Sequence, residues 1–217
     1  MRKINLITRT FILISASLLA FSASAGSFKC SKAKTETEQL ICTTPELSEL
    51  DDRLSEAYKT VLSRLNSKFL FKTSQKAWLS DLQKCKTVDC IKAEISKRTE
   101  LFENVVDEGD IGAWTGEYER YLNGKTDHST PANIILLGLK DNRIYIYGYA
   151  LGTYSSQGTH TGDIDGFANA TDGHASFSIQ NGSCNVKITL KRPNLVVEDN
   201  RQCGGMNVTF TGQYKRK

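Results

Sequence analysis

Hydrophobic residues follow two periodicities along the chain, and the change falls near residue 109. Between residues 44 and 65 apolar side chains recur three or four positions apart, which places them on one face of a helix. After residue 109 apolar and polar residues alternate in short runs, separated by turn signals such as Asp172-Gly173 and Asn181-Gly182. The pattern predicts a helical first half and a β-rich second half.

Capping signals divide the first half into four helices. Thr35 and Glu38 form a capping box, and Thr44 followed by Pro45 marks a second helix start. Thr87 is expected to begin the fourth helix and Gly109 to end it. The predicted helices cover residues 35–42, 44–65, 67–84 and 87–108.

The second half is predicted to hold eight strands, at residues 114–122, 133–139, 144–151, 164–168, 175–179, 184–190, 195–198 and 207–214. Short strands at this spacing indicate an antiparallel β-barrel or sandwich, so the fold class is α+β. The first and last strands carry one pattern twice, as Trp114-Thr-Gly-Glu-Tyr118 and Phe210-Thr-Gly-Gln-Tyr214. If these two strands pair, the repeat marks the seam of a closed barrel.

The first 25 residues are predicted to be a signal peptide rather than part of the fold. Arg2, Lys3 and Arg9 precede an apolar run at residues 11–21, and Ala23-Ser24-Ala25 fits the small-x-small cleavage pattern. We therefore expect an exported protein with two domains, a small disulfide-stapled helical domain at residues 26–108 and an antiparallel β domain at residues 109–217.

Charge excludes nucleic acid as a partner. The chain has 28 Lys and Arg against 24 Asp and Glu. Three of the basic residues and none of the acidic ones lie in the predicted signal peptide, so the remainder is nearly neutral. It lacks the basic excess of a nucleic-acid binder. No stretch after residue 25 is apolar enough to insert in a membrane.

Six cysteines follow the predicted signal peptide: Cys30, Cys42, Cys85, Cys90, Cys184 and Cys203. An even number in an exported chain predicts disulfides, and the Cys-x2-Cys and histidine spacings of zinc sites are absent. Pairing between sequence neighbours is favoured for the first four, as Cys30 with Cys42 and Cys85 with Cys90, while crossed pairing stays open. Cys184 and Cys203 are left as a third pair.

The helical half also carries a spaced set of motifs: Gln75-x2-Trp78-Leu79, Cys85-x4-Cys90 and Arg98-x2-Leu101. Together with Cys30 and Cys42, these motifs resemble the N-terminal domain of the LprI family, exported bacterial proteins named for lysozyme inhibition. The resemblance covers residues 28–103. One departure is Leu82-Gln83, where the family often has an Arg-Asp pair, so a polar contact made by that pair is lost or replaced here.

The resemblance implies a periplasmic or secreted binding protein whose protein partner is a lysozyme. A rigid, disulfide-held surface would inhibit by covering the muramidase cleft. The alternative is a periplasmic β domain that binds a ligand or a glycan, with the helical domain as an accessory and no inhibitor activity. The sequence shows no catalytic constellation, so we expect no enzyme and no cofactor. Asp163-x-Asp165-Gly166 lacks the glutamate of an EF-hand loop, and we expect no metal.

Two groups of side chains are candidates for partner contact: Tyr145, Tyr147 and Tyr149, and Glu46, Glu49 and Asp52. The tyrosines share one face of a predicted strand, which is either a structural face or a binding face. The acidic group lies in the first turns of a predicted helix, where it stabilises the helix dipole. It could also attract a basic enzyme.

Overall fold

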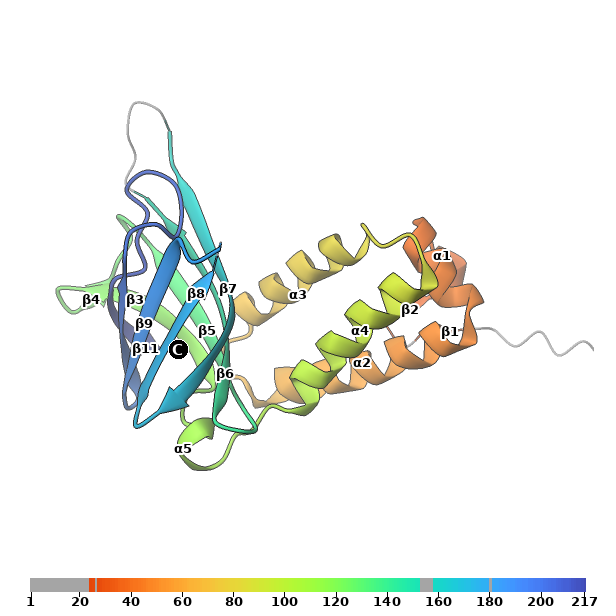
Figure 1. Cartoon of the computed structure of the whole chain (residues 1–217), viewed down its shortest axis with the longest axis horizontal. Coiled ribbons are helices and arrows are strands. Elements are labelled where there is room, and N and C mark those ends of the chain that lie inside the picture. Colours follow the sequence, from red (N-terminus) through yellow and green to blue (C-terminus); the bar gives the residue numbers. More distant parts are fainter. Residues whose placement is uncertain (1–23, 26, 153–157, 180) are drawn as a thin grey trace, which may run out of the picture.

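A computed structural model describes residues 24–25, 27–152, 158–179 and 181–217. Most of the predicted signal peptide, residues 1–23, lies outside the described residues. In the described part, a group of helices extends from one side of a β-barrel, with the first helix farthest from it (Figure 1). No helix there is both long and apolar enough to cross a membrane.

The four predicted helices are confirmed, with one boundary corrected. The helical part consists of β1 (Ser24–Ala25), β2 (Phe28–Lys29), the 3-10 helix η1 (Cys30–Lys32), α1 (Glu36–Thr43), α2 (Pro45–Arg64), α3 (Phe69–Leu82), α4 (Val88–Glu103) and α5 (Gly109–Gly112). The fourth helix ends at Glu103 rather than near residue 108, because Val105 already forms a β-bridge with Leu139.

Caps and disulfides fix the end of the helical part that lies far from the barrel. Thr35 and Glu38 form the expected capping box at α1. Cys30 is bonded to Cys42 and Cys85 to Cys90, so these four cysteines pair with their sequence neighbours rather than across. Each bridge of this kind contributes about 2–3 kcal/mol by restricting the unfolded chain.

The β-rich half is a closed antiparallel barrel. Its strands are β3 (Gly116–Leu122), β5 (Ala132–Leu139), β6 (Arg143–Leu151), β7 (Thr161–Thr171), β8 (His174–Ile179), β9 (Cys184–Lys191), β10 (Asn194–Asp199) and β11 (Gly212–Arg216). Each pairs with its neighbours in the order β3-β5-β6-β7-β8-β9-β10-β11, and β11 pairs back onto β3. A barrel, rather than a sandwich, is therefore the correct choice between the two predicted architectures.

The eight predicted strands are all present, and two details differ. A short strand β4 (Lys125–Thr126) was not expected, and it forms a hairpin with the end of β3. The last strand begins at Gly212 rather than at residue 207, because residues 207–211 form a loop held by side chains of the neighbouring strands.

The repeated pattern lies at the seam of the barrel, as predicted. In the β3–β11 pairing, Tyr118 lies opposite Arg216, and Arg120 lies opposite Tyr214. Each tyrosine hydroxyl donates to the backbone carbonyl four residues earlier, at 3.0 Å for Tyr118 and 2.7 Å for Tyr214. The two copies are thus related by a local twofold relationship, with the Glu119–Lys215 pair at its centre.

The pattern extends to an arginine two residues after each tyrosine, and each arginine binds the other copy. Arg120 donates to the carbonyls of residues 209 and 211, and Arg216 donates to those of residues 113 and 115. A Cβ atom on Gly212 would lie 2.7 Å from Cδ of Arg120, and one on Gly116 would lie 2.6 Å from Nε of Arg216. Both glycines therefore make room for the arginine of the opposite strand.

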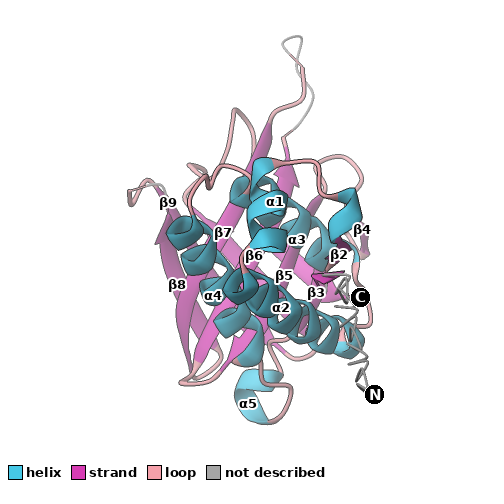
Figure 2. Ribbon diagram, turned by 90° about the vertical axis from the view of Figure 1, so that its right-hand side faces the viewer, coloured by secondary structure: helices cyan, strands magenta, loops and turns pink. Residues whose placement is uncertain are grey.

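The helices cover the outer face of β5 and β6 (Figure 2). Apolar side chains on the outside of these strands join the same core as the helices, among them Ile135, Leu137 and Leu139. The buried carboxylate of Glu117, on the outside of β3, accepts the backbone N–H of Phe71 at 2.9 Å in the first turn of α3. A carboxylate at this helix end is stabilised by the helix dipole.

Candidate partner-binding surfaces

The predicted tyrosine face is mostly covered by the helices. Tyr145 is 2% exposed and Tyr147 is 9% exposed, whereas Tyr149 is 39% exposed. Of the two roles expected for this face, Tyr145 and Tyr147 therefore have the structural one, and Tyr149 alone of the three stays a candidate for partner contact. The strand pattern placed them correctly on one face, but helices pack on that face and leave only Tyr149 accessible.

Arg98 of α4 connects the covered tyrosines to the helical motifs. Its Nε donates to Gln75 at 3.0 Å, and one of its terminal nitrogens lies 3.4 Å from the Tyr145 hydroxyl. The guanidinium also lies over the rings of Phe102 and Trp78, at 4.7 and 5.7 Å from their centroids. Gln75, Trp78 and Arg98, three residues of the spaced motifs, therefore build the junction between helices and barrel.

The junction has consequences for ionisation. Burial raises the pKa of Tyr145 far above its ordinary range, and the hydrogen bond that its hydroxyl donates to Asp165 acts in the same direction. The nearby Arg98 charge opposes both effects. Tyr145 is therefore a neutral hydrogen-bond donor inside the junction, which suits a structural role rather than contact with a partner.

The acidic candidates lie in the first turns of α2, as expected, and their side chains are accessible. Glu46, Glu49 and Asp52 are exposed. Glu46 forms an ion pair with Lys92 of α4, which neutralises part of the patch. The intervening Asp51 is buried and accepts hydrogen bonds from the backbone and side chain of Ser27. The accessible charge of this patch is therefore limited to a few side chains.

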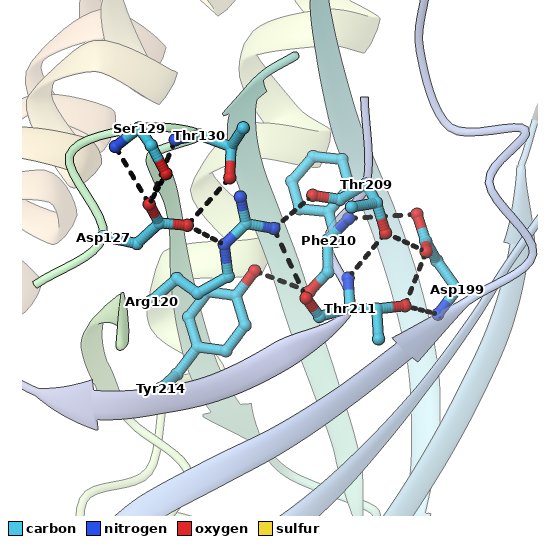
Figure 3. A network of polar contacts seen from close by, with 9 residues as sticks. All are labelled: Arg120, Asp127, Ser129, Thr130, Asp199, Thr209, Phe210, Thr211 and Tyr214. Atoms are coloured by element: carbon cyan, nitrogen blue, oxygen red, sulfur yellow. Dashed lines mark hydrogen bonds and ion pairs between the residues drawn. The ribbon is translucent and has the colours of Figure 1, made fainter. Parts of the chain in front are cut away.

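A buried ion pair, which was not predicted, lies where the end of β3 meets the loop before β11. Arg120 and Asp127 have side chains that are each 5% exposed, and Nε of Arg120 lies 3.1 Å from Asp127 (Figure 3). Asp127 also accepts the backbone N–H and hydroxyl groups of Ser129 and Thr130, at 2.7–3.0 Å. One aspartate thereby fixes the turn between β4 and β5.

These contacts determine the ionisation of Asp127. Burial raises the pKa of its carboxyl, but the hydrogen bonds from Ser129 and Thr130 outweigh burial and hold the pKa well below its usual range. Arg120 also links this turn to residues 209–211 through their carbonyls, while its Nη2 has no hydrogen-bond partner among the described residues. In the sequence, the one feature that points to this ion pair is the arginine two residues beyond the repeated Thr-Gly-x-Tyr.

A second aspartate fixes the loop that precedes β11. Asp199 accepts the Phe210 N–H at 3.0 Å and the hydroxyls of Thr209 and Thr211 at 2.6 and 2.7 Å (Figure 3). The Cys184–Cys203 disulfide ties the same loop to the start of β9. Residues 200–211 are therefore held at both ends by side-chain contacts.

The barrel interior is filled by side chains rather than hollow. Its core includes Tyr118, Phe210 and Tyr214, each fully buried, together with aliphatic residues from the other strands. Two depressions in the described part of the chain, of about 470 and 490 Å³, lie on the outside of β7–β10 and at the barrel end near α5. Trp114 borders the second but is 2% exposed, so it offers no ring face to a sugar.

The described side chains also contain no cluster of three or more His, Cys, Asp or Glu that could hold a metal ion. Asp163 and Asp165 lie on the outer face of β7 and are both exposed. The depression at the barrel end near α5 is lined mainly by polar and charged residues, among them Asp110, Asn142 and Arg192.

One family model matches the chain. Residues 30–104 match the family described as Lysozyme inhibitor LprI. The matched segment runs from the first cysteine to the end of α4 and stops before the barrel, which confirms the resemblance found in the helical motifs. The matched family is one of inhibitors rather than of enzymes. No curated protein and no solved structure matches the chain.

Proposed function

Because residues 30–104 match a family of lysozyme inhibitors, we propose that this protein binds a lysozyme and inhibits it by covering the substrate cleft. The family match is the observation that carries the proposal. Inhibition of this kind is steric, so the protein itself needs neither catalytic residues nor a cofactor.

The rigidity of the fold supports a steric inhibitor. Three disulfides, a closed barrel and a buried helix–barrel junction hold the surfaces in place before any partner arrives. A preorganised surface loses little conformational entropy on binding, and more of the contact energy then appears as affinity.

We further propose that the protein acts outside the bacterial cytoplasm, in the periplasm or after secretion. The predicted signal peptide at residues 1–25 supports export, and disulfides persist in oxidising compartments. Lysozymes act on the cell wall, so an inhibitor in this compartment would meet its target.

The division into a helical domain at residues 26–108 and a β domain at residues 109–217 remains part of the proposal. The family match points to the helical domain, while the barrel adds the largest rigid surface. The accessible candidates for partner contact are Tyr149 on β6 and Glu46, Glu49 and Asp52 on α2.

A turbidity assay tests the proposal. Purified mature protein is mixed with lysozymes of the animal, bacterial and phage types, and clearing of a bacterial cell-wall suspension is followed. We expect at least one class to lose its activity as the molar ratio approaches one. Full activity of every class in the presence of a large molar excess of the protein would refute the proposal.

A further inference from the structure

One end of the barrel carries three segments that we name the loop end: the tip of the β3–β4 hairpin at residues 122–125, residues 127–131 and residues 200–211. The hairpin projects from the barrel beyond the other strands, at the left of Figure 1. Because β11 pairs with β3, the loop before β11 lies beside the hairpin base, and Arg120 touches both. The three segments therefore form one surface.

The loop end is rigid although it consists of loops. Asp127 fixes residues 127–130, Asp199 fixes residues 209–211, and the Cys184–Cys203 bridge anchors the middle of the longer loop. At its base, Asn200 accepts the Asn185 N–H at 3.1 Å and donates to the Ser183 carbonyl at 2.7 Å. The hairpin tip is an Asn123-Gly124 turn with both residues at positive φ, as tight hairpin turns require.

The exposed Lys and Arg side chains give the loop end a positive surface charge. Its carboxylate, Asp127, is buried and paired with Arg120, and the adjoining Asp199 at the end of β10 accepts the hydrogen bonds just described. Lys125 and Arg201 are exposed and have no ion-pair partner among the described residues. Two apolar side chains accompany them, Leu122 at 56% and Met206 at 58% exposure. The surface thus combines cations with apolar contact area.

This combination of cations and apolar side chains is complementary to the substrate cleft of a glycoside hydrolase. Such clefts carry a pair of carboxyl groups that flank the scissile bond, and their walls contact the sugar faces. A cation brought to these carboxylates forms charge-assisted hydrogen bonds in a site from which water is excluded. By contrast, the exposed Glu49 and Asp52 on α2 and Asp163 near Tyr149 would be repelled by the same carboxylates.

We infer that the loop end is the part of this protein that enters the lysozyme cleft, with Lys125 and Arg201 directed at its catalytic carboxylates and Leu122 and Met206 against its walls. This inference rests on the proposed function and deepens it, because it names the contacting surface. It assigns the acidic residues of α2 at most to the rim of the complex.

Charge reversal tests the assignment. The variant K125E/R201E is compared with K187E/K191E, which changes the same total charge on exposed positions of β9 away from the loop end. Both variants and the wild-type protein are assayed against a lysozyme that degrades a soluble chito-oligosaccharide. The substituted side chains are exposed, and thermal unfolding and circular dichroism verify that each variant is folded.

The wild-type protein is expected to raise KM of the lysozyme without changing kcat, as competition for the cleft requires. K125E/R201E is expected to raise the inhibition constant at least about tenfold, and K187E/K191E by less than about twofold. Equal inhibition by all three proteins would overturn the loop-end assignment and leave the inhibitor function standing. No inhibition by the wild-type protein would overturn the proposed function and this assignment with it.

Discussion

The repeated pattern at the barrel seam allows a sharp prediction, because its two arginines occupy equivalent positions with different surroundings. Arg120 and Arg216 each donate to two backbone carbonyls of the opposite copy. Arg120 also pairs with the buried Asp127, whereas Arg216 is half-buried and has no ion-pair partner among the described residues. Replacing each arginine by methionine removes the guanidinium and keeps most of the apolar stem.

The expected costs follow from these contacts. R120M leaves a buried carboxylate without its cation, and breaking a buried pair in this way costs about 3–5 kcal/mol. R216M removes hydrogen bonds to the Ala113 and Thr115 carbonyls and a cation–π contact with the Tyr118 ring in a half-buried site, at a cost of about 1–2 kcal/mol. In a chain of this size these losses lower the melting temperature by roughly 10 °C and roughly 4 °C, respectively.

Urea denaturation monitored by tryptophan fluorescence and circular dichroism, with the disulfides intact, measures the free energy of unfolding of both variants. D127N serves as the control, because it removes the charge that Arg120 neutralises. It should cost less in the R120M background than in the wild-type protein. If R216M destabilises the protein as much as R120M does, the buried ion pair contributes nothing beyond the shared backbone contacts, which would refute the stabilising role assigned to it.

Three further predictions concern the same structure. Because the folded pKa of Asp127 lies below its unfolded value of about 3.9, its contribution is complete above that value and is lost as the pH falls further; unfolding titrations should show a weaker acid loss for D127N than for the wild-type protein. Removing the Cys184–Cys203 bridge as C184A/C203A should lower the free energy of unfolding by about 3 kcal/mol, because the bridge joins residues 19 positions apart and restricts the unfolded chain. Calorimetry that shows no change in stability would contradict this. R98M should cost about 1–3 kcal/mol, because Gln75 loses its donor at the junction; an unchanged urea midpoint would exclude a structural role for this contact.

The sequence was sufficient to predict the helices, the eight strands of the barrel and its seam, because each depends on a local signal. Apolar spacing defined α2, the capping box at Thr35 defined α1, and the repeated Thr-Gly-x-Tyr identified the strands that close the barrel. These signals act within a few residues or repeat visibly along the chain.

The candidate surfaces were less predictable, because they depend on which elements pack on one another. Alternation placed Tyr145 and Tyr147 on one face of a strand but gave no indication that helices would cover it. The Asp127 and Asp199 contacts were also missed, since an aspartate beside small polar residues has the same local pattern in an ordinary turn. Both aspartates hold segments that Arg120 joins across the seam, since Arg120 pairs with Asp127 and binds carbonyls about 90 positions away, in the loop that Asp199 fixes.

The most direct test of cleft occlusion is a calorimetric titration of lysozyme with the mature protein, performed with and without a saturating chito-oligosaccharide. We expect 1:1 binding to the free enzyme and a large loss of apparent affinity when the oligosaccharide fills the cleft. Binding of unchanged affinity in the presence of the oligosaccharide, or no binding in its absence, would contradict occlusion of the cleft.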